Sequence, residues 1–334
     1  MKNKKKVAVV TGGAGFIGSH MVDLLLKKNF YVNVIDDLSG GTTSNLKHHF
    51  KNKNFNFEKK DLCKLDINHK FFLGCDYVFH FAGKGDIVPS IENPIKYLDV
   101  NIMGTARVLE AAKKAGVKKL VYSASSSCYG MAKTPTSEND TINPLYPYAM
   151  SKYLGEKLCF HWFKLYKLPV NSIRIFNAYG PRVKTTGVYG AVFGVFFKQK
   201  LENKAFTIVG NGNQKRDFVF VTDVVDAFFK ASQTKISGEI FNLGTGKPNS
   251  INHLVKILGG KRIYIPKRPG EPNITCANPK KIQKILKWKP KVKFENGVKI
   301  MIMDIKKWKN APLWNPNSIK KATKLWFSYM KNIR

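Results

Sequence analysis

The 334-residue sequence lacks the features that mark membrane or disulfide-rich proteins. It has no apolar run of about 18 residues, so we expect no membrane-spanning helix. Its basic N-terminal tip passes directly into an apolar strand and a glycine-rich turn, which does not fit a signal peptide. The cysteines are few, odd in number and without CxxC spacing: Cys63, Cys75, Cys128, Cys159 and Cys276. We therefore expect free thiols, a cytoplasmic location and no metal site.

Acidic residues and arginine are both scarce. Lys and Arg together number 57 against 22 Asp and Glu, which gives a formal net charge of +35. The cations are mostly lysines spread along the whole chain, so we expect only a mild affinity for polyanions and no specific nucleic-acid function. Arginine alone offers a planar pair of donors to phosphate, which makes each arginine a candidate for that role. The candidates are Arg174, Arg182, Arg216 and Arg268, with a structural salt bridge as the alternative for each.

The N-terminal segment has the pattern of a dinucleotide-binding unit. Residues 7–11 (VAVVT) predict a buried strand, GGAGFIG follows, and a helical pattern comes next. A second apolar strand, YVNVI, ends in two aspartates. Glycines allow backbone amides to approach a pyrophosphate, while a carboxylate after the second strand accepts from a ribose hydroxyl and repels a 2′-phosphate. The pattern therefore favours NAD over NADP, with contacts at Gly12, Gly15, Gly18, Asp36 and Asp37.

Further strands are predicted at FNFEKKDL, DYVFHFAG and KKLVYSAS, with a helix near 95–115. Strands that alternate with helices predict an α/β fold with a Rossmann-type doubly wound parallel sheet, whose ligands bind at the carboxyl ends of the strands. Asp61 then either meets the adenine or caps a turn. Phe81, Ala82 and Gly83 follow the fourth strand and are expected to flank the cofactor.

Beyond residue 176 the alternation weakens into shorter units. We expect a NAD-binding domain over 1–176 and a smaller, interleaved α/β substrate lobe over 177–334, with a C-terminal helical extension. Within the lobe, Gly-Asn-Gly-Asn at 210–213 predicts a hairpin turn, and Thr222 predicts a helix cap. The Trp-rich tail predicts a helix that covers the lobe or meets a partner.

Residues 121–152 carry the candidate catalytic groups. Ser125 follows the fifth strand, and Tyr148 opens a helix with Lys152 one turn further on. The lysine ammonium is then roughly 6 Å from the tyrosine on the same helix face. A nearby cation favours the phenolate, so we expect Tyr148 to serve as a base near neutral pH while Ser125 holds the reacting oxygen. The alternative for an isolated YxxxK is an ordinary helix-surface pair.

The combination of motifs resembles the extended short-chain dehydrogenase/reductase family, in its NAD-dependent nucleotide-sugar epimerase and dehydratase branch. The resemblance covers residues 6–300 and rests on TGGAGFIG, HFAG, SSSCYG, YAMSK, RIFNAYGPR, QKRDFVFVTDV and RPGEP, together with the Asp36-Asp37 strand end and the Asn101 helix. It implies that Ser125, Tyr148 and Lys152 are catalytic. The NAD set it implies adds Phe16, Ile17, Leu62, Asn101 and Phe176. The substrate set it implies is Ser125, Ser126, Asn177, Val192, Arg216, Arg268 and Thr275.

The activity implied by the resemblance is a 4-epimerase that oxidises C4 of a UDP-hexose to a 4-keto sugar and reduces it again from the other face. Dehydratases of the branch place Asp and Glu directly after the catalytic hydroxyl residue, whereas this chain has Ser126 and Ser127 there. Hydroxyls cannot transfer the protons that elimination needs near neutral pH, which favours epimerisation. UDP-glucose and UDP-galactose are the expected substrates.

Several alternatives stay open at this point. One is a UDP-N-acetylhexosamine or UDP-glucuronate 4-epimerase. Others are a 4,6-dehydratase, a decarboxylase, a keto-reductase and a non-catalytic NAD-binding regulator. The resemblance also implies a homodimer formed by the helices of Tyr97 and Tyr148. By the same resemblance Thr275 bounds the side of the sugar that carries the 2-substituent, and its small size would admit an N-acetyl group.

Overall fold

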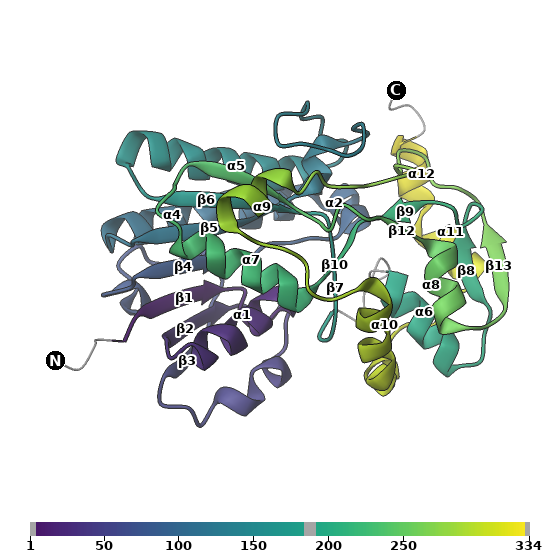
Figure 1. Cartoon of the computed structure of the whole chain (residues 1–334), viewed down its shortest axis with the longest axis horizontal. Coiled ribbons are helices and arrows are strands. Elements are labelled where there is room, and N and C mark those ends of the chain that lie inside the picture. The colour runs from purple at the N-terminus through teal and green to yellow at the C-terminus, as the bar shows by residue number, and fades with distance from the viewer. Residues whose placement is uncertain (1–4, 184–191, 331–334) are drawn as a thin grey trace.

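The computed structural model describes residues 5–183 and 192–330 (Figure 1). A seven-stranded parallel sheet with helices on both faces forms one side of the molecule, and a smaller group of helices and short strands forms the other. The elements up to residue 175 are β1 (Val7–Thr11), α1 (Phe16–Lys27), β2 (Tyr31–Asp36), β3 (Phe55–Lys59), β4 (Tyr77–His80), α2 (Ile87–Glu92), α3 (Pro94–Leu98), α4 (Gly104–Lys114), β5 (Lys119–Ser125), α5 (Pro147–Tyr166) and β6 (Val170–Ile175).

The elements after residue 176 are β7 (Asn177–Tyr179), α6 (Val192–Leu201), β8 (Phe206–Val209), β9 (Lys215–Arg216), β10 (Phe218–Phe220), α7 (Val221–Gln233), β11 (Glu239–Leu243), β12 (Asn249–Ser250), α8 (Ile251–Leu258), β13 (Arg262–Ile265), α9 (Lys280–Leu286), α10 (Phe294–Met303), α11 (Pro316–Ala322) and α12 (Lys324–Met330). The strand order of the large sheet is β11-β6-β5-β4-β1-β2-β3. The order reverses between β1 and β4, and such a switch point opens a crevice at the carboxyl ends of the strands. The predicted Rossmann-type α/β fold is confirmed.

Alternating side chains of the sheet pack against two helical layers. Ala8 and Val10 of β1 belong to the buried cluster that includes side chains of α1 and α7, whereas Val9 belongs to the cluster with α4 and α5. The predicted helix near 95–115 is present as α3 and α4, joined by a π-helical turn at 99–103. Such turns are frequent at functional sites, and this one carries Asn101.

The smaller part of the molecule is held together mainly by aromatic rings. Three two-stranded sheets, β10-β7, β12-β9 and β13-β8, lie in the described part of the chain outside the large sheet. Tyr179 stacks on Phe193 with ring centroids 5.1 Å apart. Trp308, from the C-terminal segment, is buried against Phe197 at 4.8 Å. The tail is therefore part of the core of this lobe.

Strand β11 lies far beyond residue 176 and still pairs with β6 in the large sheet. Sequence order and spatial division therefore do not coincide after residue 176. We propose the boundary between 176 and 177 for the substrate lobe itself. Helix α7, strand β11 and the helix that packs on β11, α9, return to the first domain.

Two local predictions in this region are wrong. The turn at 210–213 does not close a hairpin, because β8 pairs with β13 and β9 pairs with β12. Thr222 does not cap α7: the helix begins at Val221, and its N-cap, Phe220, makes no side-chain hydrogen bond. Asp223 instead accepts hydrogen bonds from the backbone amides of Lys291 and Val292. In both cases partners distant in the sequence replace the local ones.

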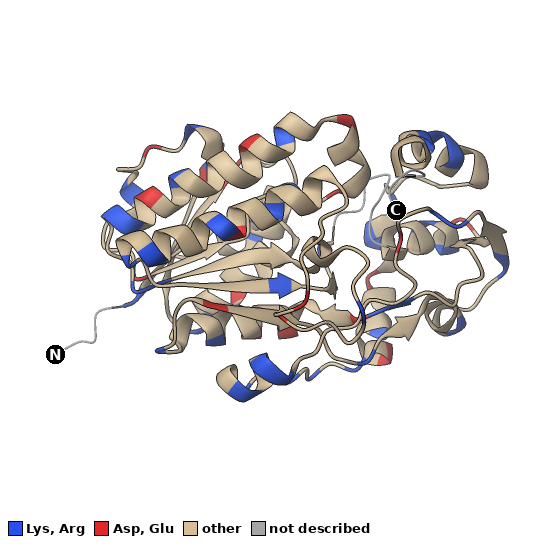
Figure 2. Ribbon diagram, turned by 90° about the horizontal axis from the view of Figure 1, so that it is seen from above, with Lys and Arg blue, Asp and Glu red and all other residues tan. Residues whose placement is uncertain are grey.

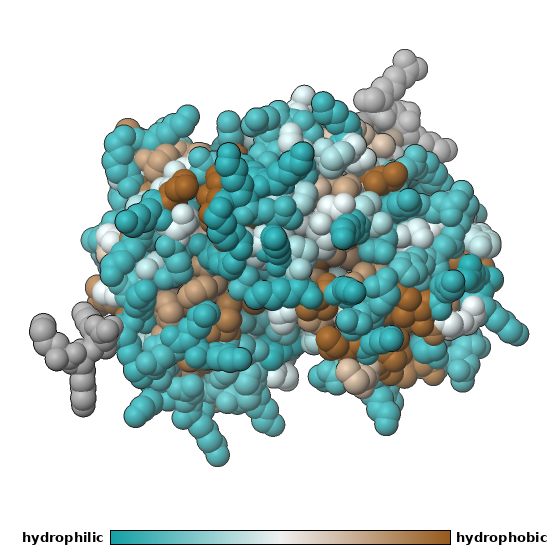
Figure 3. Space-filling view, in the orientation of Figure 1, coloured by the Kyte–Doolittle hydropathy of each residue, from teal (hydrophilic) through white to brown (hydrophobic). Residues whose placement is uncertain are grey.

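The surface carries its positive charge on many elements. Lys and Arg occur on helices of both parts of the molecule (Figure 2), and the face seen in Figure 3 is mostly hydrophilic with separate apolar areas. All five cysteines are free thiols, and four of them are buried. Among the described residues there is no helix with both the length and the apolar character needed to cross a membrane.

Candidate active site

Three connected cavities lie at the carboxyl ends of the strands. The glycine cavity, about 300 Å³, is lined by the turn between β1 and α1 and by the ends of β2 and β3. The tyrosine cavity, about 710 Å³, contains Ser125, Tyr148 and Lys152. The interlobe cavity, about 390 Å³, lies towards the smaller lobe. Phe16 and Gly83 line both of the first two cavities, and Asp86 and Phe176 line both of the last two, so the three form one path.

The glycine turn leaves room only for bare backbone. Gly12 has φ +69°, and a Cβ there would lie 2.6 Å from the backbone nitrogen of Ala82. A Cβ on Gly18 would lie 2.1 Å from the carbonyl oxygen of Gly12. The N-cap of α1 is Gly15, which has no side chain to bond the first helical amides, and the first turn has no acidic residue. Phe16 and Ile17 follow in this first turn, so the site fits the phosphates of a dinucleotide.

Three carboxylates stand at the far end of the glycine cavity. Asp36 is buried and accepts from the backbone amides of Ala14, at 2.9 Å, and Leu38, at 2.7 Å. Burial raises the pKa of this carboxyl group, while those backbone hydrogen bonds lower it. Asp37 binds the amide and hydroxyl of Ser39. Asp61 caps a turn through the amide of Cys63, and it also lines the cavity, as does Leu62, so the two readings of Asp61 are compatible.

The segment after β4 forms the wall between the glycine and tyrosine cavities. Phe81, Ala82 and Gly83 line the glycine cavity, as expected for residues flanking a cofactor. Asn101 lines none of the three cavities. Its side chain is buried and bonds both the amide and the carbonyl of Lys84, at 2.8 and 3.0 Å, so it positions this segment from behind.

Tyr148 lies in the first turn of α5, in the wall of the tyrosine cavity. Burial raises the pKa of its phenol, a hydrogen bond with Ser125 lowers that pKa in part, and Asp86 and Cys128 raise it further. The predicted lowering of the pKa by Lys152 is therefore wrong for the protein as described. Desolvation outweighs helix-surface proximity, because the group lies in a cavity and not on an exposed helix face.

Lys152 is on the same helix but is almost fully buried. Its ammonium lies 4.5 Å from the centroid of the Tyr122 ring, and a Cβ on Gly83 would lie 3.5 Å from it. Burial lowers the pKa of Lys152 to about 8. The ammonium thus stands beneath the wall shared with the glycine cavity, where a ribose of a bound dinucleotide is expected.

The serines after β5 form a short turn between two cavities. Ser125 caps this turn, accepting from the amide of Ser127 at 3.2 Å, and it lines the tyrosine cavity. Ser126 and Ser127 line the interlobe cavity instead. The positions directly after Ser125 therefore present hydroxyls towards the substrate side.

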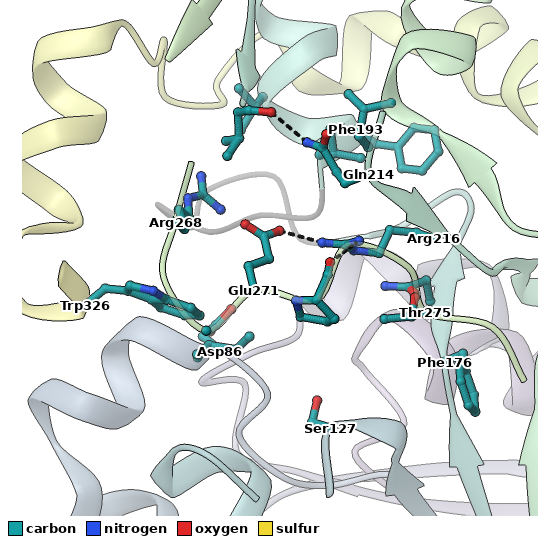
Figure 4. Close-up of a pocket in the computed structure, with 18 of the residues that line it drawn as sticks. Asp86, Ser127, Phe176, Phe193, Gln214, Arg216, Arg268, Glu271, Thr275 and Trp326 are labelled. Carbon is teal, nitrogen blue, oxygen red and sulfur yellow. Dashed lines mark hydrogen bonds and ion pairs between the residues drawn. The ribbon is translucent and has the colours of Figure 1, made fainter. Parts of the chain in front are cut away.

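The interlobe cavity brings two predicted arginines together. Arg216 donates to Glu271 at 2.7 Å and to the carbonyl oxygen of Pro272 at 2.9 Å. Figure 4 shows the Glu271 carboxylate between the guanidinium groups of Arg216 and Arg268. Both arginines line the cavity, so two cations face the space where an anionic ligand would bind.

Four other predicted residues line the same cavity. Asn177 and Thr275 are joined by a hydrogen bond of 3.0 Å from the threonine hydroxyl to the amide oxygen. Val192 contributes an apolar side chain from the start of α6, and Phe176 lies between this cavity and the tyrosine cavity.

The other two arginine candidates belong elsewhere. Arg174 is buried and makes an ion pair and hydrogen bonds with Glu156 while its Nη1 donates to Tyr129 at 2.7 Å. Arg182 binds Asp23 at 2.8 Å. Both arginines therefore form structural salt bridges, which was the alternative to phosphate binding. Sequence could not separate them from Arg216 and Arg268, because only folding brings Arg174 to Glu156 and Arg182 to Asp23.

One group of potential metal ligands gathers outside these cavities, although no ligand spacing is apparent in the sequence. Asp23, His48 and His49 offer atoms within 4.8 Å of one another. Both imidazoles reach the same Asp23 oxygen, at 2.8 and 2.7 Å, and Arg182 reaches the other. Hydrogen bonds and an ion pair thus account for the cluster.

Sequence reasoning missed part of the interlobe lining. The missed residues include Asp86, Tyr146 and Glu271 in three loops, Gln214 in the β8-β9 connection, and Trp314 and Trp326 in the tail. Glu271 lies within RPGEP and Tyr146 stands two residues before Tyr148, so both had a local signal. For the tail residues, the only signal in the sequence was the high tryptophan content of the segment.

Known proteins share the sequence pattern and the fold of this chain. The NAD dependent epimerase/dehydratase family matches residues 8–244. The UDP-glucose 4-epimerase of Mycolicibacterium smegmatis is 36% identical over 299 residues, which span 87% of this chain and 95% of the relative.

Two solved structures have the same fold with a TM-score of 0.84 each, and both comparisons span 90% of this chain and 99% of the other. One is the UDP-N-acetylglucosamine 4-epimerase of Methanobrevibacter ruminantium with UDP-N-acetylmuramic acid, 32% identical. The other is the UDP-glucuronic acid 4-epimerase of Bacillus cereus with UDP-glucuronic acid and NAD, 33% identical. The predicted cofactor, NAD, is confirmed, and the chain belongs to the NAD-dependent nucleotide-sugar epimerase/dehydratase family, within the extended short-chain dehydrogenases/reductases.

Proposed function

We propose that this protein is a UDP-sugar 4-epimerase whose main substrates are UDP-glucose and UDP-galactose. The observation that carries the proposal is the tyrosine cavity, where Ser125, Tyr148 and Lys152 meet beside the glycine cavity, while the two positions after Ser125 are hydroxyls. The set can oxidise and reduce a sugar carbon. It has no adjacent acid and base for elimination at C5 and C6.

In this proposal the sugar nucleotide spans two cavities. The hexose lies in the tyrosine cavity, with its 4-hydroxyl held by Ser125 and facing Tyr148. The diphosphate lies between Arg216 and Arg268, because guanidinium pairs grip phosphate in a fixed geometry. The uracil then contacts the apolar side chain of Val192. A fixed diphosphate allows the sugar to turn about its bond to the phosphate while the nucleotide stays in place.

The proton of the 4-hydroxyl passes to the Tyr148 oxygen. Because burial raises the pKa of this phenol, positive charge must stabilise the phenolate, and we assign that role to Lys152, a buried lysine of the same cavity. The glycine turn and Asp36 would hold NAD, which would accept a hydride from C4 and supply it again. After the 4-keto sugar turns, Tyr148 gives the proton back to the oxygen at C4. Ser125 holds that oxygen on both occasions.

The test is product analysis with UDP-glucose. The expected product is UDP-galactose with no solvent hydrogen at C5, measured by chromatography and by mass spectrometry in deuterated water. A 4-keto-6-deoxy sugar, or deuterium at C5, would contradict the proposal.

One observation supports a second candidate activity, 4,6-dehydration. Asp86 lies in the wall of both substrate cavities, and its charge acts on Tyr148. A carboxylate near the sugar could transfer a proton, or it could repel the carboxylate of a uronic acid. We expect the second role, because elimination needs both an acid and a base at C5 and C6, and Glu271 is paired with Arg216. Asp86→Asn should then raise kcat/KM for UDP-glucuronate relative to UDP-glucose by about tenfold. Formation of a 4-keto-6-deoxy product by the wild type, lost in this variant, would instead establish the dehydratase role.

A further inference from the structure

Helix α12 (Figure 1) lies at the end of the described part of the chain and contributes a side chain to the interlobe cavity. Trp326 of this helix lines the cavity, together with Trp314 and Ile319 from the segment before it. Trp326 is only 4% exposed. The Trp326 side chain is therefore part of the cavity wall and is not available on the surface to bind another protein.

Helix α12 holds the segment that carries the cavity's charged groups. The indole Nε1 of Trp326 donates to the carbonyl oxygen of Pro269 at 2.7 Å. Met330 packs on Gly270, where φ is +68° and a Cβ would lie 2.4 Å from the methionine methyl carbon. The segment from 266 to 279 forms no helix or strand. It carries Arg268 and Glu271, so contacts with α12 fix the backbone between these two side chains.

The same two side chains also pack α12 against the first domain. Trp326 and Met330 form a buried cluster with Val88 of α2, and Ile87, Ile91, Leu145 and Tyr146 pack on it. The Trp326 and Tyr146 rings are 6.0 Å apart, and Tyr146 stacks on Tyr148 with centroids 6.3 Å apart and planes 11° apart. A row of three aromatic rings thus runs from the catalytic tyrosine to the C-terminal helix. Figure 4 shows Trp326 and Asp86 close together on the wall of the cavity below Arg268.

We infer that α12 is part of the substrate site and acts as a clasp between the two parts of the molecule, with Trp326 as its positioning residue. The ring closes one wall of the cavity and excludes water, which strengthens the pairing of a diphosphate with Arg216 and Arg268. Its indole N–H fixes the segment that presents Arg268. The nature of the ligand, a nucleoside diphosphate sugar, rests on the proposed function.

The test compares Trp326→Ala with Tyr329→Ala. Tyr329 lies on the same helix and is 61% exposed, so its loss removes an aromatic ring of α12 without touching the cavity. Calorimetric titration of the full-length, folded proteins with UDP and, separately, with NAD measures the two affinities. For Trp326→Ala we expect the Kd for UDP to rise by about tenfold or more, which corresponds to about 1.4 kcal/mol, with the Kd for NAD unchanged. Tyr329→Ala should match the wild type in both.

A fluorescence measurement adds a readout independent of affinity. UDP should change the tryptophan emission of the wild type, and Trp326→Phe, which keeps an aromatic ring but loses the N–H bonded to Pro269, should reduce that change and raise the Kd for UDP less than Trp326→Ala does. An unchanged Kd for UDP in Trp326→Ala would overturn the inference. Equal losses of NAD and UDP affinity would also overturn it, because they indicate a general structural role. If the wild type binds UDP but forms no epimer, the proposed function fails while the role of α12 is still decided by the UDP titrations.

Discussion

The ammonium of Lys152 lies 4.5 Å from the centroid of the Tyr122 ring, and the Tyr122 hydroxyl donates to the Lys152 carbonyl oxygen at 3.2 Å. This buried tyrosine thus holds both ends of the lysine, its charged group through the ring face and its backbone through the hydroxyl. The charge of Glu156 favours the cation, but burial has the larger effect. Its pKa is consequently lowered by burial, to about 8.

The lowered pKa predicts a pH-dependent contribution of Lys152 to stability. The ordinary pKa is 10.5 and the folded value is about 8, so between these values the unfolded state binds more protons than the folded state. The free energy of unfolding should therefore rise with pH in this window, by about 1.4 kcal/mol per pH unit from this group. The Lys152→Met variant has no ammonium at this position and therefore lacks this pH-dependent contribution to the free energy of unfolding. Urea unfolding of both proteins at several pH values should show their difference changing between pH 8 and 10.5, whereas parallel curves would refute the assignment.

The same substitution tests the catalytic role of Lys152. If the ammonium both supports the phenolate and contacts the cofactor, Lys152→Met should lower the turnover number and the retention of NAD together. Cofactor content after gel filtration and initial rates measure the two effects. If only the turnover number or only the NAD content falls, Lys152 does not have both roles.

Tyr148→Phe removes the phenol and keeps the ring that stacks on Tyr146. NAD should still bind, while turnover should fall by about a hundredfold or more, because the proton of the 4-hydroxyl has no acceptor. Tyr146→Phe is the matched control, since it deletes a hydroxyl from the neighbouring ring. Retained activity in Tyr148→Phe would show that another group is the base.

Thr275→Tyr tests which sugars the site admits. Thr275 lines the interlobe cavity, which meets the tyrosine cavity at Phe176, so we expect a larger side chain there to narrow the space where the sugar joins the diphosphate. We expect kcat/KM for UDP-N-acetylglucosamine to fall by about tenfold relative to UDP-glucose. Thr275→Ser, which keeps the hydroxyl, should leave the ratio unchanged. Equal losses on both substrates would place Thr275 away from the 2-substituent.

The helices of Tyr97 and Tyr148 predict a homodimer. Helices α3 and α5 pack on each other, and their outer faces, with the turn before α4, expose Ile95, Met103, Met150 and Leu154, by 64, 54, 40 and 37%. Light scattering should give twice the single-chain mass of 37.8 kDa. Met103→Glu combined with Met150→Glu should yield monomers, whereas Met131→Glu, which changes a methionine exposed by 56% and outside these helices, should not. A monomeric wild type would reject the dimer.

Sequence alone predicted the parts of the site that depend on short segments. The glycine turn, the aspartates after β2 and the Tyr148-Lys152 pair are each set within one strand, turn or helix. Their backbone geometry follows from local residue types such as Gly12, whose positive φ favours glycine. The doubly wound sheet was predictable for the same reason, since buried strands and amphipathic helices alternate in order.

Tertiary structure decided what depends on partners distant in the sequence. Arg174 and Arg216 look alike in the sequence, but only the fold pairs one with Glu156 in the core and brings the other to the interlobe cavity. The pKa of Tyr148 is raised because folding removes water from its phenol, an effect that the YxxxK spacing does not contain. Trp326 reaches the cavity only because α12 folds back onto α2 and Pro269. Local segments thus determine backbone conformation, whereas burial and long-range contacts determine which side chains meet and how strongly each holds its proton.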